Sequence, residues 1–196
     1  MLDTTRGRIN ARPQLSGHPL GSTSRVPPTS SVRRLTRHEW RNYKELRLRA
    51  LADSPAAFAT TLAEAQTRGD VDWSRQVTSG AESPSEIALV AEADSQLVGL
   101  AWSRIDSSAA HRAYLYQMWV DPNFRGLGTG RNLLAAVIRW ATSVSARLII
   151  LSVTCGNTPA TRLYSSAGFE PVGHPEPLRP GSDLLVQPMQ LDLRTA

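Results

Sequence analysis

The stretch Arg125-Gly126-Leu127-Gly128-Thr129-Gly130 decides the fold of this chain. It lies between a strand-like stretch at 112–120 and a stretch at 131–143 whose apolar residues recur at helical spacing. The first amides of a helix have no partner within the helix and carry a partial positive charge. Glycines leave such amides uncovered, so the turn predicts a site for a phosphate-bearing ligand, with Arg125 adding a charged contact.

Two other glycine-rich phosphate loops are excluded by spacing. A nucleoside-triphosphate loop needs Gly-x-x-x-x-Gly-Lys-Ser/Thr, but no lysine follows this turn, and the only lysine is Lys44. A dinucleotide fold needs Gly-x-Gly-x-x-Gly, but Gly130 comes one place too early after Gly126 and Gly128. The turn therefore belongs to neither class.

The segments around this turn predict a mixed α/β fold. Upstream, Thr36-x-x-Glu39 fits a capping box that opens a helix, which Ser54-Pro55 ends. We expect two short helices at 58–66 and 71–77, a further helix at 158–166, and strands at 32–35, 86–93, 96–105, 112–120, 148–154, 169–172 and 184–193. This order predicts a mixed, mostly antiparallel sheet of about six to seven strands, flanked by helices on both faces.

Composition restricts the class of protein. The chain has 196 residues, of which 41% are hydrophobic, and a net charge of +5. This length fits one domain, which we place at 31–196. Residues 1–30 carry four arginines, one aspartate and only scattered large apolar residues, so we expect a disordered basic tail. No apolar run reaches the length of a membrane span, and the basic residues form no cluster typical of nucleic-acid binding.

A second motif follows the turn and, with it, indicates a family. Asn157-x-x-Ala160-x-x-Leu163-Tyr164-x-x-x-Gly168-Phe169 comes after the strand at 148–154, and Met118-Trp119-Val120-Asp121-Pro122 precedes the turn. The turn itself matches Arg/Gln-x-x-Gly-x-Gly/Ala. Together these residues resemble the GNAT superfamily of acyl-CoA-dependent N-acyltransferases, most strongly over 115–173 and more weakly over 32–193.

The resemblance implies a binding site for acetyl-CoA as cosubstrate. In this family the amides of the turn hold the CoA pyrophosphate, and the strand before it splays from its neighbour and pairs with the pantetheine arm. The implied cofactor-binding residues are Met118, Trp119, Val120, Arg125, Gly126, Leu127, Gly128, Thr129, Gly130 and Asn157. Tyr164 matches the tyrosine that protonates the leaving thiolate. Packing alone for Tyr164, and helix capping for Asn157, are the alternative interpretations.

The general base is not identified by the sequence. Family members often carry a glutamate on the strand before the turn, whereas this strand reads Tyr114-Leu115-Tyr116-Gln117-Met118 and has no carboxylate. Tyr116, a chain of waters, Glu92 or Asp106 are the candidates. A covalent route through Cys155 is disfavoured because no histidine accompanies it in that segment. The four histidines show no metal-ligand spacing, so no metal is expected.

The resemblance implies a cytoplasmic enzyme that moves an acetyl group to a primary amine by direct attack in a ternary complex. The amine belongs to a small molecule or a protein, and no nucleic-acid or membrane partner is expected. Homodimers are common in the family, although no sequence feature establishes one. Two other hypotheses remain, a non-catalytic CoA-binding sensor and a scaffold or nucleotide-binding protein. Candidate residues for acceptor selection are Trp40, Tyr43, Phe58, Trp73, Trp102, His174 and Arg179.

Overall fold

A single open sheet organises residues 30–194, which are the residues that the computed structural model describes. The predicted tail at 1–30 lies outside them except for Ser30 and stays a prediction. The sheet runs in the order β1-β2-β3-β4-β5-β8-β6, with β7 also paired to β8. Its strands are β1 (Ser31–Arg34), β2 (Glu86–Ala93), β3 (Gln96–Ile105), β4 (Arg112–Val120), β5 (Leu148–Thr154), β6 (Glu170–Pro171), β7 (Glu176–Pro177) and β8 (Leu185–Asp192). All pairs are antiparallel except β4 with β5.

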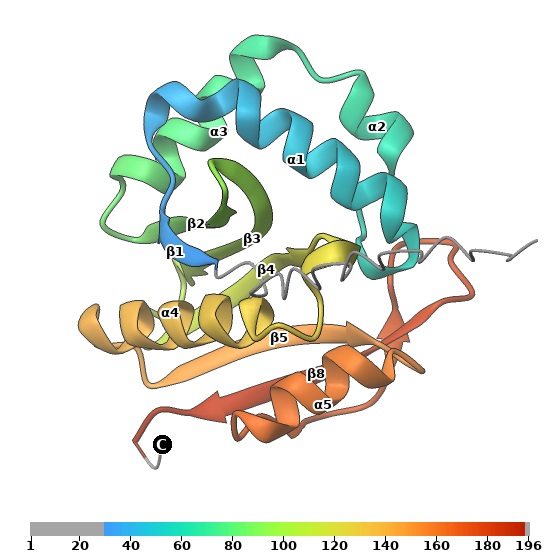
Figure 1. The fold of residues 1–196 in the computed structure, drawn as a ribbon. Helices are drawn as coiled ribbons and strands as arrows, with labels where there is room; N and C mark the ends of the chain where they lie inside the picture. The colour runs from blue at the N-terminus through green and yellow to red at the C-terminus, as the bar shows by residue number, and fades with distance from the viewer. Residues whose placement is uncertain (1–29, 195–196) are drawn as a thin grey trace, which may run out of the picture.

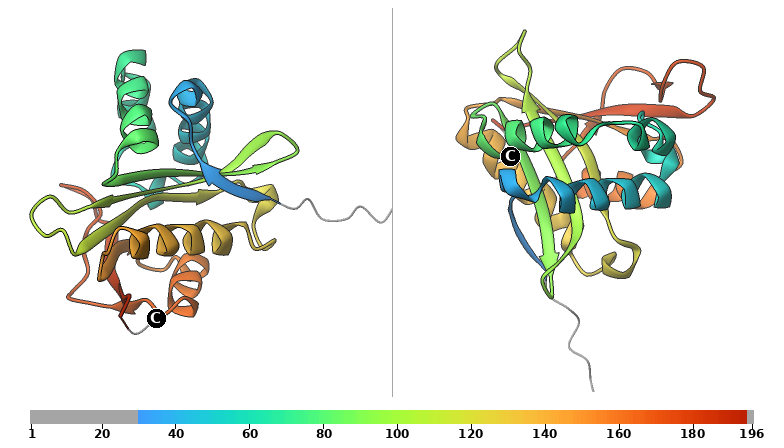
Figure 2. Two further views of the ribbon diagram at one scale, coloured as in Figure 1. Left: turned by 90° about the vertical axis from the view of Figure 1, so that its left-hand side faces the viewer. Right: turned by 90° about the horizontal axis from the view of Figure 1, so that it is seen from above.

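Helices cover both faces of this sheet (Figures 1 and 2). One face carries α1 (Trp40–Asp53), α2 (Leu62–Gln66) and α3 (Asp70–Glu82), and the other carries α4 (Thr129–Ser143) and α5 (Thr158–Ser166). The predicted fold class is therefore confirmed. Among residues 30–194, none of the helices has the length and apolar character needed to cross a membrane.

Two of the predicted helix boundaries are wrong for local reasons. The helix expected at 58–66 begins only at Leu62, because Thr61 forms a capping box in which its Oγ accepts from the Glu64 amide at 3.2 Å. The helix expected at 71–77 extends over 70–82, beyond its apolar residues. The Thr36–Glu39 capping box is present, although it opens a short 3₁₀ turn that precedes α1.

Each face of the sheet has its own apolar core. Beneath α4 and α5 the core includes Leu133, Val137, Ile149 and Phe169. Beneath α1 and α3 a second core gathers the large aromatic residues Tyr43, Trp73, Trp102 and Trp119. The sheet between them is therefore buried on both faces at its centre.

A β-bulge in β4 changes the face to which its residues point. Trp102 pairs with Tyr116 and Leu100 pairs with Trp119, so β4 has two residues where β3 has only one. Gln117 takes the left-handed conformation, with φ of +55°. Ala113 and Leu115 pack in the α4 core, whereas Trp119 packs in the α1 core, which simple alternation would not allow. The bulge thus directs Gln117 toward α1 and gives β4 its irregular end.

Candidate active site

The strands β4 and β5 separate immediately beside the bulge. Their parallel pairing covers only Arg112–Tyr114 against Leu148–Ile150. Beyond Tyr114 the two strands diverge, so the second half of β4 has an unpaired edge in the middle of the sheet. Unpaired backbone groups at such an edge accept an extended ligand as an additional strand would be accepted. The splayed strand that the family resemblance implies is therefore present.

Met118 and Val120 direct their backbone groups into this gap. The Asp121 amide donates to the Val98 carbonyl at 2.8 Å, so Asp121 and, two residues earlier, Trp119 face β3. In an antiparallel pair the residues between them direct their N–H and C=O groups to the opposite side. The side chains of Met118 and Val120 meanwhile pack against the α4 core. Packing and backbone binding are thus compatible at these two residues.

The glycine-rich turn presents free amides at the start of α4. Gly126 and Gly128 have φ of +77° and +86°, and a Cβ at either position would meet no atom within 4 Å. Arg125 donates its amide to the Pro122 carbonyl and Asn132 donates to the Gly128 carbonyl, but none of the amides from 126 to 131 has an acceptor within residues 30–194. The predicted anion site is therefore open, with both glycines in a backbone conformation that other residues adopt at a cost.

Arg125 makes contacts within the protein that the sequence did not indicate, and its contact with a phosphate stays a prediction. Its Nε donates to the Val120 carbonyl at 2.8 Å, and its Nη2 forms an ion pair with Asp53. Asp53 also accepts a hydrogen bond of 2.8 Å from the indole Nε1 of Trp119. The guanidinium therefore ties the turn to β4 and to the end of α1. Sequence analysis missed Asp53 as a positioning residue.

The pKa of Asp53 reflects these contacts. Partial burial acts to raise it, but hydrogen bonds from Ser54, Trp119 and Arg125 together hold the pKa below its usual value. Asp53 is therefore ionised at neutral pH and keeps its ion pair with Arg125.

Thr129, whose side chain is buried in the first turn of α4, bonds to Ser30 through its hydroxyl at 2.9 Å.

Tyr164 and Asn157 come together on α5, beside the gap. Tyr164 is 7% exposed, packs on Phe169 at 5.9 Å between ring centroids, and its hydroxyl has no hydrogen-bond partner within residues 30–194. Burial raises the pKa of Tyr164 above its usual value, so the phenol stays protonated at neutral pH. Asn157 caps α5 by accepting from the Ala160 amide at 3.3 Å, which leaves its amide nitrogen for another partner. Asn157 can therefore cap α5 and bind a ligand at the same time.

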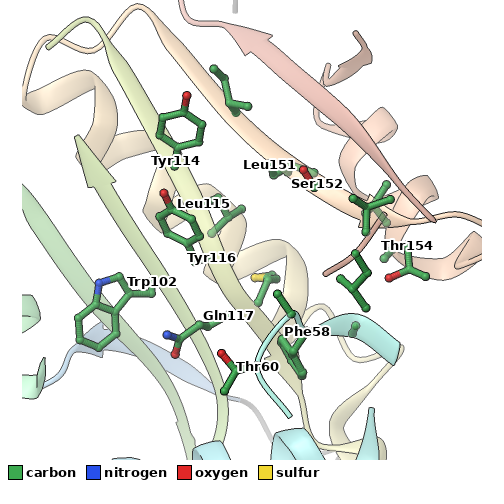
Figure 3. Close-up of a pocket in the computed structure, with 18 of the residues that line it drawn as sticks. Phe58, Thr60, Trp102, Tyr114, Leu115, Tyr116, Gln117, Leu151, Ser152 and Thr154 are labelled. Atoms are coloured by element: carbon green, nitrogen blue, oxygen red, sulfur yellow. The ribbon is translucent and has the colours of Figure 1, made fainter. Parts of the chain in front are cut away.

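An open cavity of about 700 Å³ lies at the gap, and neither Trp119, Val120 nor the turn residues 125–130 line it. Met118, Asn157 and Tyr164 line it together with residues from both sides of the gap. Figure 3 shows Tyr114 and Tyr116 on β4, and Ser152 and Thr154 on the neighbouring strand β5. Of the residues expected to select the acceptor, only Phe58 and Trp102 line the cavity. Tyr43 and Trp73 lie in the core, because their side chains fill the space between α1, α3 and the sheet.

Two carboxylates line the cavity, and the sequence analysis named neither. Glu86 accepts from the Trp102 indole at 3.4 Å and pairs with Arg104 at 3.6 Å, whereas Glu176 is exposed on β7. The two carboxylates considered from sequence do not line the cavity. Glu92 is paired with Arg33 at 2.7 Å, and Asp106 bonds to Ser108 in the loop after β3. Glu86 is the first residue of an apolar strand, and no local sequence pattern distinguishes it from a solvent-exposed residue at a strand end.

A polar chain links the bulge to the helical face. The Tyr43 hydroxyl donates to Gln117 at 2.5 Å and accepts from Gln76 at 3.1 Å. Burial raises the pKa of Tyr43 to about 12, so this hydroxyl is also protonated at neutral pH. The bulge is therefore held by a hydrogen bond across the α1 core, and Gln117 is placed at the cavity wall.

Cys155 is exposed and lies outside the cavity wall. Within residues 30–194, no three histidine, cysteine or acidic side chains gather in a way that would hold a metal ion. The expectation of a metal-free site stays a prediction.

A splayed parallel pair beside a glycine-rich turn, with a buried tyrosine at the gap, has the shape and the free amides that an extended anionic ligand needs. Residues 36–169 match the model of the acetyltransferase (GNAT) family. The match covers more than half of the chain, and the chain belongs to this family.

Similar proteins support the same assignment. A mycothiol acetyltransferase from Brachybacterium faecium is 30% identical over 184 residues, covering 91% of this chain and 53% of that protein. The chain spans about half, or less, of the length of the curated relatives that it matches.

Among solved structures, the ribosomal-protein-alanine N-acetyltransferase of Brucella melitensis is 26% identical, with a TM-score of 0.65 and coverage of 83% of this chain and 99% of that one. The Salmonella typhimurium protein yncA, solved with acetyl-CoA, is 20% identical, with a TM-score of 0.71 and coverage of 84% and 94%. The latter likeness concerns the fold alone.

Proposed function

We propose that this chain is an N-acetyltransferase that moves the acetyl group of acetyl-CoA to a primary amine. The observation that carries the proposal is the divergence of β4 from β5 directly beside a turn with six free amides. Family membership and the presence of acetyl-CoA in the yncA structure support it.

The residues at the gap fit a long ligand with a phosphate-bearing end. The amides from Gly126 onward would hold the pyrophosphate at the start of α4, where the helix dipole favours negative charge. Met118 and the amide of Val120, whose carbonyl already accepts from Arg125 Nε at 2.8 Å, would pair with the pantetheine arm, and the free amide nitrogen of Asn157 would donate to it. The thioester supplies an acetyl carbon open to attack by an amine.

Tyr164 is the proposed donor to the leaving sulfur. The amine nitrogen attacks the acetyl carbon, the C–N bond forms as the C–S bond breaks, and the electron pair leaves on sulfur. A backbone amide of β4 stabilises the charge on the carbonyl oxygen, a contact that typically contributes a factor of roughly 10²–10³. Because burial raises the Tyr164 pKa, the phenol is a hydrogen-bond donor that releases its proton only as negative charge develops on sulfur.

Glu86 is the proposed acceptor of the amine proton, through water. An ammonium group is not nucleophilic, so one proton must leave before the attack and a second leaves as the amide forms. Glu86 is better suited than Glu176, because Trp102 and Arg104 hold its carboxylate, whose side chain is 16% exposed, at the cavity wall. Glu86→Gln should therefore lower the kcat for acetyl transfer, because the glutamine amide cannot accept the amine proton.

The acceptor class and the domain assignment are also proposals. The relatives' names suggest the deacetylated form of mycothiol and a peptide with an N-terminal alanine as first candidates. We keep 31–196 as the catalytic domain. A need for acetyl-CoA supports the expected cytoplasmic location, and homodimer formation stays a prediction.

The test is thiol release from acetyl-CoA over a panel of primary amines, with wild type beside Tyr164→Phe. The panel holds the two candidates above, polyamines, amino acids and aminoglycosides. We expect amine-dependent release in the wild type and at least a tenfold lower kcat in the variant, which falls within the usual range for a general acid.

Stability provides the control for this variant. Because the Tyr164 hydroxyl has no partner within residues 30–194, its removal should leave the melting temperature and the acetyl-CoA affinity unchanged. Acetyl-CoA binding without release on any amine would contradict the enzyme and favour the CoA-binding sensor. A chain that binds no acetyl-CoA would contradict both and favour a scaffold.

A further inference from the structure

Arg47 is a buried guanidinium without an acidic partner. It lies on α1, is 5% exposed and lines the cavity. Its Nη1 is buried with no hydrogen-bond acceptor, and within residues 30–194 no carboxylate lies within ion-pair distance of any of its nitrogens. The guanidinium of Arg47 instead stacks on the Phe58 ring, whose centroid lies 4.1 Å from the guanidinium carbon.

Such an arginine is unfavourable for the free protein. Burial lowers the pKa of Arg47 to about 10, so the group is still charged at neutral pH. A second cation, Arg68, stacks on Trp73 at 4.1 Å, and its charge repels that of Arg47. Buried charges are normally paired because removing them from water costs several kcal/mol. An unpaired one at a cavity wall indicates an anion that is supplied by a ligand.

The charged residues that line the cavity indicate which kind of anion would bind. Its wall carries two arginines, and the other one, Arg104, is already paired with Glu86. One unpaired positive charge matches a monoanion, and the flat guanidinium fork matches the two oxygens of a carboxylate. Arg47 comes from α1, on the face of the sheet opposite α4 and α5, which carry the turn and Tyr164 (Figure 2). The anion therefore belongs to the acceptor side of the gap.

We propose that Arg47 binds a carboxylate of the acceptor, so that the preferred acceptors are amines carrying a carboxylate, such as free α-amino acids. This inference rests on the proposed acetyl transfer. Phe58, which Figure 3 shows beside the gap, holds the guanidinium by stacking, and the acceptor carboxylate completes its hydrogen bonds. The carboxylate would also fix the distance of the amine from the thioester.

The experiment uses matched acceptors and matched variants. Each of the twenty amino acids is offered as the free acid and as the C-terminal amide, with wild type, Arg47→Met and Arg47→Lys. We expect wild type to prefer an acid over its amide by at least tenfold in kcat/KM. Arg47→Met should lose this preference, and Arg47→Lys should keep part of it. Arg41→Met, an exposed arginine that stacks on Trp40 of the same helix, is the control and should change neither value.

Stability and binding give readouts that do not need turnover. Removing an unpaired buried charge should leave the melting temperature of Arg47→Met equal to or above that of wild type. With CoA bound, the preferred amino acid should raise the melting temperature of wild type and not that of Arg47→Met.

Two results would overturn the carboxylate site, and a third would separate that site from the proposed enzyme. Equal use of acids and amides would leave acetyl transfer intact and refute the carboxylate site. A large loss of stability in Arg47→Met, with the acid preference kept, would make Arg47 a packing residue. Amino acids that bind through Arg47 without any acetylation would instead refute the proposed enzyme and keep the anion site.

Discussion

At the scale of single residues, the site depends on groups that are exceptions to ordinary folding preferences. Tyr164 is a buried phenol without a hydrogen-bond partner within residues 30–194, and Gln117 is a non-glycine residue in the left-handed conformation. The conformation of Gln117 costs the folded state free energy, and both residues border the same cavity. Strain and unsatisfied groups of this kind gather where a ligand completes the contacts.

Gly128 tests the free amides of the turn. A Cβ at Gly128 meets no neighbouring atom, so Gly128→Ala suffers only from the positive φ, about 1–2 kcal/mol of unfolding free energy. The new methyl group would lie at the start of α4 and hinder a phosphate, so we expect at least a tenfold weaker affinity for acetyl-CoA by calorimetry.

Gly173→Ala is the matched control for that variant. Gly173 also has a positive φ, +62°, and open space around it, but it lies in the loop between β6 and β7. We expect a similar loss of stability with unchanged affinity. Equal affinity losses in the two variants would show that strain, rather than access to the amides, explains the result.

At the scale of elements, α1 positions both sides of the site. Its buried face packs on β3 and its last residue, Asp53, reaches Trp119 on β4 and Arg125 in the turn. The turn is therefore fixed to α1 by side chains, since it has few backbone hydrogen bonds of its own.

Asp53→Asn should loosen the turn. The substitution removes the ion pair with Arg125 and keeps the side chain's size, so we expect a three- to tenfold rise in the Kd for acetyl-CoA and a lower melting temperature. Asp94→Asn, in the β2–β3 turn, should change neither. An unchanged Kd in Asp53→Asn would remove Asp53 from the positioning of the turn.

The start of α1 predicts a pH-dependent contribution to stability. A hydrogen bond from Arg33, opposed by partial burial and assisted by the Thr36 amide, lowers the pKa of Glu39 to about 2, from 4.5. This contribution is complete above the unfolded pKa and is lost as pH falls from about 4.5 through about 2.

Glu39→Gln should accordingly destabilise the chain by about 1 kcal/mol at pH 7, since the pair is partly exposed. The difference from wild type should shrink at pH 3, as measured by urea unfolding. Glu45→Gln, on the exposed face of α1, should have no effect at either pH. A difference that is the same at pH 7 and pH 3 would contradict the assignment of this contribution to Glu39.

At the scale of the whole molecule, a sheet buried on both faces carries the stability and a gap within it carries the site. The two cores on either side lie within residues 32–193. The large apolar residues of the tail predicted at 1–30 are scattered among polar residues, prolines and glycines and form no periodic apolar stretch.

Removal of residues 1–29 should therefore leave the melting temperature and the acetyl-CoA affinity unchanged. The shortened chain keeps Ser30, whose hydroxyl bonds to Thr129 at the start of α4. Calorimetry on both chains is the measurement. A weaker affinity in the shortened chain would assign residues 1–29 a part in cosubstrate binding and move the domain boundary.

The sequence by itself determined the class of fold, the turn and the order of elements. Glycines at 126 and 128 and apolar periodicity are local signals, because backbone conformation and helix spacing depend on residues close together in the chain. Two helices begin at Thr129 and Leu62, and these first residues were predicted less well than the helices themselves. Apolar spacing identifies the middle of a helix but does not fix its end.

Only the tertiary structure decided the partners of the charged groups. Arg125 meets Asp53 across 72 residues, Glu86 reaches the cavity from the far end of β2, and Arg47 is left without a carboxylate. Whether a charge is paired, solvated or buried depends on segments that the fold brings together, and no spacing along the chain carries that information. The motif therefore indicated the cosubstrate, while the carboxylate-bearing acceptor that we propose rests on the packing of α1 beside the gap.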